Sequence, residues 1–196
     1  MKRTLWLVLA MVCLAVSLPL LVWGFWPPHR EMATVPLVVP AGMPSLADGR
    51  MIRLTFSPAM RAGDSQIVEL NLSAGEAGGG VDEGYRVITE ARLELPLANV
   101  RPAEVVSAAL VEGSGATFYW EVTPRETGDL SGTVWLYLRF VPKTGGEGTR
   151  QPVSAQLIGV STRSMLGRTG SQARVAGVVG GLIGLVGILG WRRTSL

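Results

Sequence analysis

The chain has 196 residues, of which 47% are hydrophobic and 17% charged, and its formal net charge is +3 at pH 7. One cysteine (Cys13) and one histidine (His29) exclude an intrachain disulfide, a cysteine zinc cluster and a multi-histidine metal site. The basic surplus lies in the terminal pairs Lys2–Arg3 and Arg192–Arg193, beside apolar segments, so it indicates membrane orientation and no nucleic-acid binding.

Residues 1–26 are predicted to form an N-terminal transmembrane anchor. Residues 4–26 contain no charge, and about 17–25 helical residues cross a bilayer. A secretory signal is the alternative, but the apolar run exceeds the usual length and ends in bulky WGFWPP without a small-residue cleavage site. Trp23 and Trp26 are typical of an interfacial aromatic anchor, so we expect an uncleaved helix.

A proline-rich linker is predicted at 27–49, with a short strand at Leu37–Val39, and a β-sandwich at 50–163. Apolar residues alternate with polar or aromatic ones in MIRLTFS, IVELNLS and TVWLYLRFV, which indicates strands with one buried face. Weaker candidates are residues 85–95, 104–112, 117–123 and 152–162. Seven or eight strands separated by glycine-rich turns predict an antiparallel sandwich.

The segments SPAMRAGDSQIVELNL and YWEVTPRETGDLSGTVWLYLRF resemble those of extracytoplasmic bacterial Ig-like domains. The resemblance covers residues 50 to 160. It implies a mainly β, Ig-like fold and a binding or scaffolding habit, and it transfers no functional residue to this chain. The disulfide of antibody-type domains is absent.

The C-terminal part is predicted as a linker at 164–174, a glycine-rich transmembrane helix at 175–191 and a cytoplasmic tail at 192–196. Ser171 is the expected N-cap. At about 100° per residue, Gly177, Gly180, Gly181 and Gly184 fall on one face. They form two overlapping G-x-x-x-G pairs, a pattern that lets another backbone approach closely. The partner is the first helix, a second copy of the chain or another membrane protein.

Catalytic and cofactor chemistry find little support in the residues. His29 lies in the linker, so a Ser-His-Asp triad is not available, and the glycine clusters lack the Lys-Ser/Thr of a P-loop. Glu76, Asp82 and Glu83 could ligate calcium but lack EF-hand spacing. Glu90, Arg92 and Glu94 share one strand face and are expected to form a solvated ion-pair row. We expect no enzyme, no cofactor and no metal site.

Trp135 and Tyr137 are the candidate binding residues, because they lie opposite the aliphatic row of the strand TVWLYLRFV. Exposed aromatic rings on one sheet face suit a protein partner or a glycan. The alternative is that a neighbouring loop or the linker covers them. Trp120, in contrast, is expected in the core.

The sequence therefore predicts a non-enzymatic protein of the plasma (inner) membrane with two spans, both termini cytoplasmic and the central domain extracytoplasmic. Its expected role is protein interaction, as an accessory or scaffold subunit of an envelope complex, with other membrane or envelope proteins as partners and a homo-oligomer possible through the glycine-rich helix. The alternatives are a ligand- or glycan-binding sensor and, less favoured, an envelope hydrolase.

Overall fold

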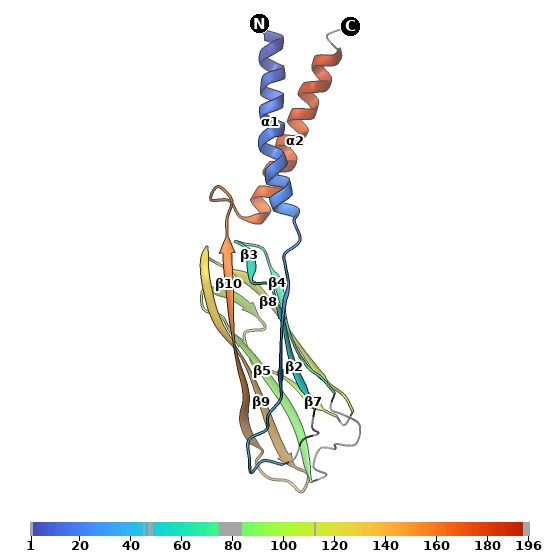
Figure 1. The fold of residues 1–196 in the computed structure, drawn as a ribbon, viewed down its shortest axis with the longest axis vertical. Helices are drawn as coiled ribbons and strands as arrows, with labels where there is room; N and C mark the ends of the chain where they lie inside the picture. Colours follow the sequence, from blue (N-terminus) through green and yellow to red (C-terminus); the bar gives the residue numbers. More distant parts are fainter. Residues whose placement is uncertain (1, 45, 47–48, 75–83, 112, 194–196) are drawn as a thin grey trace. The chain divides into compact units, whose positions relative to one another are not determined.

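The computed structural model describes residues 2–44, 46, 49–74, 84–111 and 113–193 (Figure 1). The chain divides into two compact units. The helical unit contains Met1–Pro28, Arg61–Asp64 and Arg163–Leu196, and the sandwich unit contains His29–Met60 and Ser65–Thr162. The short segment Arg61–Asp64, which begins at the last residue of a strand, thus belongs with the terminal helices.

Two antiparallel sheets of five strands each form the β-structure of the described residues; the alternation predicts such a sandwich, but with seven or eight strands and not ten. One has the order β1-β2-β4-β8-β6 and the other β3-β10-β9-β5-β7. The first contains β1 (Glu31–Pro36), β2 (Met51–Phe56), β4 (Gln66–Leu72), β8 (Ala116–Pro124) and β6 (Ala98–Arg101). The second contains β3 (Ala59–Arg61), β10 (Thr149–Arg163), β9 (Gly128–Pro142), β5 (Tyr85–Glu94) and β7 (Val106–Leu110).

The core of the sandwich is built by the inward positions of the alternating strands. Along β9, Val134, Leu136, Leu138 and Phe140 are buried while the residues between them are more exposed. Trp120 of β8 is fully buried, which confirms its expected place, and its ring stacks at 6.3 Å from that of Phe118. Burial of such large apolar side chains is the main favourable term in folding.

Three strands differ from the expected pattern. The predicted strand at Leu37–Val39 is wrong: the strand there is β1, which ends at Pro36, while Leu37 and Val39 pack against the core outside any strand. Every residue of β1 is exposed, so alternation had no buried face to reveal. The strands β3 and β6, only three and four residues long, were hidden among turn signals.

A buried arginine, Arg50, joins three segments of the sandwich unit by hydrogen bonds. Arg50 is 2% exposed, and its Nη1 donates to the carbonyl oxygens of Ser73 (3.0 Å) and Ser114 (2.9 Å). Burial lowers the pKa of Arg50, because desolvation disfavours the charged form. The guanidinium thus ties together the ends of β2 and β4 and the segment before β8.

The terminal helices are α1 (Lys2–Phe25) and α2 (Gly170–Arg193). The predicted N-cap at Ser171 is wrong, because α2 begins one residue earlier and its cap is Thr169. The Thr169 Oγ1 accepts from the Gln172 N–H at 3.3 Å, and the Gln172 Oε1 accepts from the Thr169 N–H at 3.1 Å. This reciprocal pair is a capping box, which the sequence TGSQ carries.

Thr169→Ala is expected to destabilise the start of α2 by about 1 kcal/mol, because it leaves a backbone N–H without its acceptor. Hydrogen exchange of the amides in the first turn of α2, measured on the full chain in detergent, reports this opening. Thr169→Ser is the matched control, because serine keeps the hydroxyl oxygen that accepts from the Gln172 N–H. Equal protection in both variants would contradict the assignment of Thr169 as the cap.

Candidate functional site

A seam of glycines on α2 packs against α1 within the helical unit. A Cβ placed on Gly177 would lie 2.8 Å from Leu21 Cγ, and one on Gly184 would lie 2.7 Å from Leu14 Cγ. A Cβ on Gly180 would overlap the Ser17 Oγ. The structure therefore brings three of the four predicted glycines together on the first of the proposed partners, the helix of the same chain.

The fourth predicted glycine lies off this seam. A Cβ on Gly181 would meet nothing within 4 Å, whereas a Cβ on Gly187, which borders the predicted stripe, would lie 3.0 Å from Ala10 Cβ. The contacting glycines thus follow a spacing of three, four and three residues, as in the a and d positions of a heptad. The predicted G-x-x-x-G pairing through Gly181 does not describe the contact with α1.

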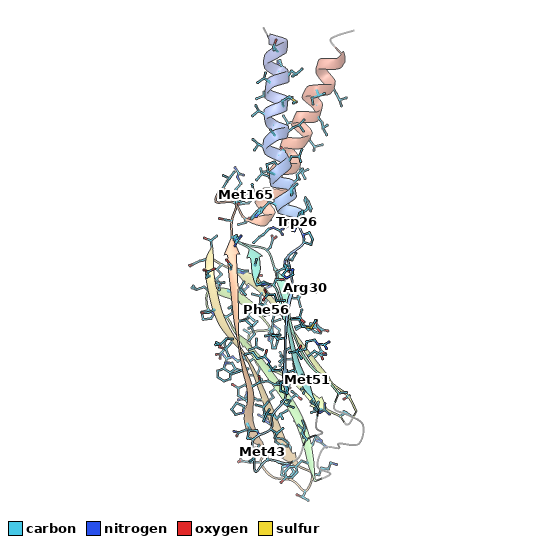
Figure 2. The ribbon with its side chains drawn as sticks, viewed as in Figure 1. Trp26, Arg30, Met43, Met51, Phe56 and Met165 are labelled. Atoms are coloured by element: carbon cyan, nitrogen blue, oxygen red, sulfur yellow. The ribbon has the colours of Figure 1, made fainter. Side chains whose placement is uncertain are left out.

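Both helices are long and apolar enough to cross a membrane. The candidate spans are Trp6–Phe25, with a mean hydropathy of 2.4 over its window, and Gly170–Gly190, with 1.9. Figure 2 shows side chains standing out from both helices. The exposed ones include aliphatic residues such as Val12 and Val186. Such surfaces are costly in water and suit the hydrocarbon of a bilayer.

An ionic clasp, formed by Arg61, Asp64 and Arg174, joins the segment 61–64 to both helices. Arg174 donates to both carboxylate oxygens of Asp64, at 2.9 and 2.7 Å, and to the Gly24 carbonyl oxygen at 3.1 Å. The Asp64 side chain is 9% exposed and that of Arg174 32%. A bidentate, partly buried pair of this kind fixes both position and orientation.

The second arginine of the clasp reaches the end of α1. Arg61 lies 3.6 Å from the Asp64 carboxylate, donates to the Trp26 carbonyl oxygen and places its guanidinium 5.5 Å from the centre of the Trp23 ring. Sequence reasoning missed this cluster. The available signal was the i, i+3 pair in RAGD together with Arg174, an arginine at the edge of an apolar span.

The aromatic face is the outer side of the sheet around β9. Trp135 and Tyr137 lie opposite the buried Leu136 and Leu138 and are half-buried. Their rings stack with centres 6.2 Å apart, and Arg150 of β10 lies 4.0 Å above the Tyr137 ring. Each ring is therefore packed against its neighbours within the sheet face, which leaves part of it accessible.

Ion pairs hold this face in place. The Glu90 carboxylate lies 3.0 Å from Arg139 Nε and 2.6 Å from Arg150 Nε, and the Trp135 Nε1 donates to Glu94 at 3.1 Å. Glu90 is only 6% exposed, so the expectation of a solvated row is wrong for this residue. The strand register brings two arginines from β9 and β10 over it, which the spacing along β5 does not show.

The structure bears on the metal expectations only in part. Glu76, Asp82 and Glu83 lie outside the described residues. In the ranges that are described, no group of three or more His, Cys, Asp or Glu side chains is arranged to hold a metal ion. His29 is exposed, as expected for a residue of the linker.

Comparison with known proteins yields likenesses of fold alone. No protein-family model matches the chain, and no curated protein matches its sequence. The similar solved structures are β-sandwich domains at 8–14% identity.

One is in the complex of zinc 2-glycoprotein and prolactin inducible protein from human seminal plasma, with a TM-score of 0.40, 8% identity and coverage of 63% of this chain and 100% of that one. Another is AggA, the major subunit of aggregative adherence fimbriae type I of Escherichia coli. Its TM-score is 0.36 and its identity 10%, and the match covers 61% of this chain and 99% of that one. A third is a PapD-like domain of human CEP192, with a TM-score of 0.33, 14% identity and coverage of 70% of this chain and 99% of that one. These values describe a loose likeness between sandwich domains, consistent with the Ig-like resemblance.

Proposed function

We propose that this protein is a non-enzymatic, two-span membrane protein that presents its β-sandwich on the extracytoplasmic side for interaction with another protein. In this role it is an accessory or scaffold subunit of an envelope complex in the plasma (inner) membrane. The two helices hold the chain in the bilayer, and both termini are cytoplasmic. Its partners are other membrane or envelope proteins.

The aromatic face is the observation that carries the interaction role. It combines Trp135 and Tyr137 with Arg139 and Arg150, and tryptophan, tyrosine and arginine are the residues enriched at the energetic centres of protein interfaces. The ion pairs of Glu90 restrict the two arginines, so little conformational freedom remains to be lost on binding.

The helix pair supports the membrane part of the proposal. Its glycine seam gives close packing, on which helix association in lipid depends. The basic ends Lys2–Arg3 and Arg192–Arg193 support a cytoplasmic location of both termini by the positive-inside rule. Arg174 lies at the opposite end of α2 from Arg192–Arg193, so its positive charge counts against this orientation. Asp64 pairs with Arg174 and offsets that charge. Because three of the four predicted glycines already contact α1 of the same chain, a second copy of the chain is not needed to explain them.

A glycan-binding sensor is the less favoured alternative. Ring stacking on a sugar needs an open aromatic face, and Arg150 covers one face of Tyr137.

The double variant Trp135→Ala, Tyr137→Ala is expected to lose its partner. The full chain is purified in mild detergent, and the co-purifying envelope proteins are quantified by mass spectrometry. We expect a loss of about tenfold or more, since truncation of a central aromatic residue typically costs over 1 kcal/mol of binding. Tyr119→Ala is the matched control, because Tyr119 is 56% exposed on the outer side of the other sheet. Unchanged recovery in the double variant would contradict the proposal.

Reporter fusions test the orientation separately. A periplasmic reporter inserted between residues 143 and 149 should be active, and one fused after residue 196 should be inactive. The opposite pattern would place the sandwich in the cytoplasm.

A further inference from the structure

A tight hairpin precedes α2 in the helical unit. Met165 and Arg168 exchange backbone hydrogen bonds, with N···O distances of 3.3 and 3.0 Å. The two residues between them have positive φ, 54° at Leu166 and 69° at Gly167. Two central residues with positive φ are the mark of a type I′ turn, which favours Asn-Gly or Asp-Gly. A leucine at the first central position works against this preference.

The same leucine is 80% exposed. Arg163 and Arg168, on either side of the tip, are also exposed. The hairpin thus presents an apolar side chain between two cations, immediately before a helix that is apolar enough to span a membrane.

The figures place the hairpin beside the helix ends. Figure 1 shows the connection after Arg163 curling up alongside the first turn of α2 before it enters the helix. In Figure 2, Met165 is labelled near the level of Trp26, at the end of α1. Tryptophans near the end of a span are typical of the membrane–water interface, so a membrane-spanning helix pair would bring the hairpin to the depth of the lipid headgroups.

We propose that this hairpin is a membrane-contact site, in which Leu166 enters the boundary between headgroups and acyl chains while Arg163 and Arg168 bind lipid phosphates. The occupant is the phospholipid surface of the leaflet that surrounds this end of the helix pair. Burial in lipid offsets the exposure of the leucine, and arginine is suited to phosphate recognition. The proposal rests on the two helices spanning the membrane.

A second leucine serves as the comparison. Leu97, in the sandwich unit, also has positive φ (64°) and is 56% exposed. It follows Pro96 in a loop between β5 and β6, and its carbonyl oxygen accepts from the Arg125 N–H at 3.0 Å. Positive φ and exposure alone therefore do not define the site, and the position of the hairpin directly before a candidate membrane span does.

Spin labels in the full chain test the proposal. Single cysteines replace Leu166, Leu97 or Val186 in a Cys13→Ser background, and the protein is placed in nanodiscs of phosphatidylcholine and phosphatidylglycerol. Collision rates with a water-soluble nickel complex and with oxygen report the depth of each label. We expect nickel accessibility at residue 166 to be severalfold lower than at residue 97. Equal accessibility at these two positions would overturn the hairpin proposal.

Val186 separates the two levels of inference. It is 68% exposed on α2, so a label there must show high oxygen and low nickel accessibility if the helices span the membrane. Low nickel accessibility at residue 186 with high nickel accessibility at residue 166 would refute the hairpin site alone. High nickel accessibility at both positions would refute the membrane proposal as well.

A second measurement places the spin label on a cysteine that replaces Ser164, which is exposed, so that residue 166 carries no label. The chain with the native Leu166 is then compared with Leu166→Asn. Asparagine tolerates positive φ better than leucine, so the turn should persist while nickel accessibility rises. Leu97→Asn is the control and should change nothing. No rise with Leu166→Asn would overturn the role of the leucine.

Discussion

Gly184→Leu is expected to separate the two terminal helices, whereas Gly181→Leu leaves them paired. The two changes are chemically identical and three residues apart on α2. At Gly184 even a Cβ would lie 2.7 Å from Leu14 Cγ and 3.1 Å from the Ala10 carbonyl oxygen. At Gly181 nothing lies within 4 Å. Overpacking of a close contact costs about 1–3 kcal/mol, which amounts to roughly a fivefold to 150-fold loss of pairing.

A disulfide across the seam measures this pairing. In a Cys13→Ser chain, Ala10→Cys and Gly187→Cys would bring two Cβ atoms to 3.0 Å, shorter than the roughly 3.5–4.5 Å of a disulfide, so a small outward shift of the helices brings the pair into range. Its rate of formation under mild oxidation, followed by loss of free thiol in detergent, should fall with Gly184→Leu and stay unchanged with Gly181→Leu. Equal rates in both variants would show that the seam does not hold the helices together.

Asp64→Ala is expected to open the ionic clasp and destabilise the helical unit by about 3 kcal/mol. Removing one partner of a buried pair leaves the other charge uncompensated, which costs about 3–5 kcal/mol in full burial. The partial exposure of Arg174, at 32%, places the value at the lower end. Both arginines of the clasp lose their carboxylate in this variant, and Arg174 retains only the Gly24 carbonyl oxygen.

Trypsin cleavage after Arg61 reports the opening of the clasp. The bond is expected to be protected in the native chain, and its cleavage should accelerate in Asp64→Ala because the segment 61–64 is released from the helices. Asp129→Ala is the matched control, since Asp129 is an exposed aspartate of β9. Arg174→Lys should give an intermediate rate, because lysine cannot form the bidentate pair. A rate in Asp64→Ala equal to that of the control would contradict the clasp.

The clasp also explains how the charge of Arg174 is accommodated at the edge of an apolar span. An arginine at the extracytoplasmic edge of a span weakens the positive-inside bias when charges are counted along the chain. Asp64 is 110 residues away in sequence from Arg174 and pairs with it. The pair lowers the effective positive charge at that edge, so the terminal basic pairs keep their weight in the proposed orientation.

Alternation determined the sandwich and the aromatic face from the sequence alone, because period two along one strand is a local property. It placed Trp120 in the core and put Trp135 and Tyr137 on the opposite side of β9 from Leu136. It could not find β1, whose residues are all exposed. It also could not show that Glu90 is buried, because the arginines that cover it come from β9 and β10.

The sequence by itself also determined two long apolar helices and a glycine-rich face on the second, since length, composition and angular spacing are local. Only the tertiary structure decided that Gly187 joins Gly177, Gly180 and Gly184 in the contact with α1 and that Gly181 does not. A face defined at 100° per residue is about a third of the helix circumference, while a contact line is narrower and its direction depends on the neighbour. The clasp belongs to the same category, because no local pattern joins residues 61–64 to residue 174.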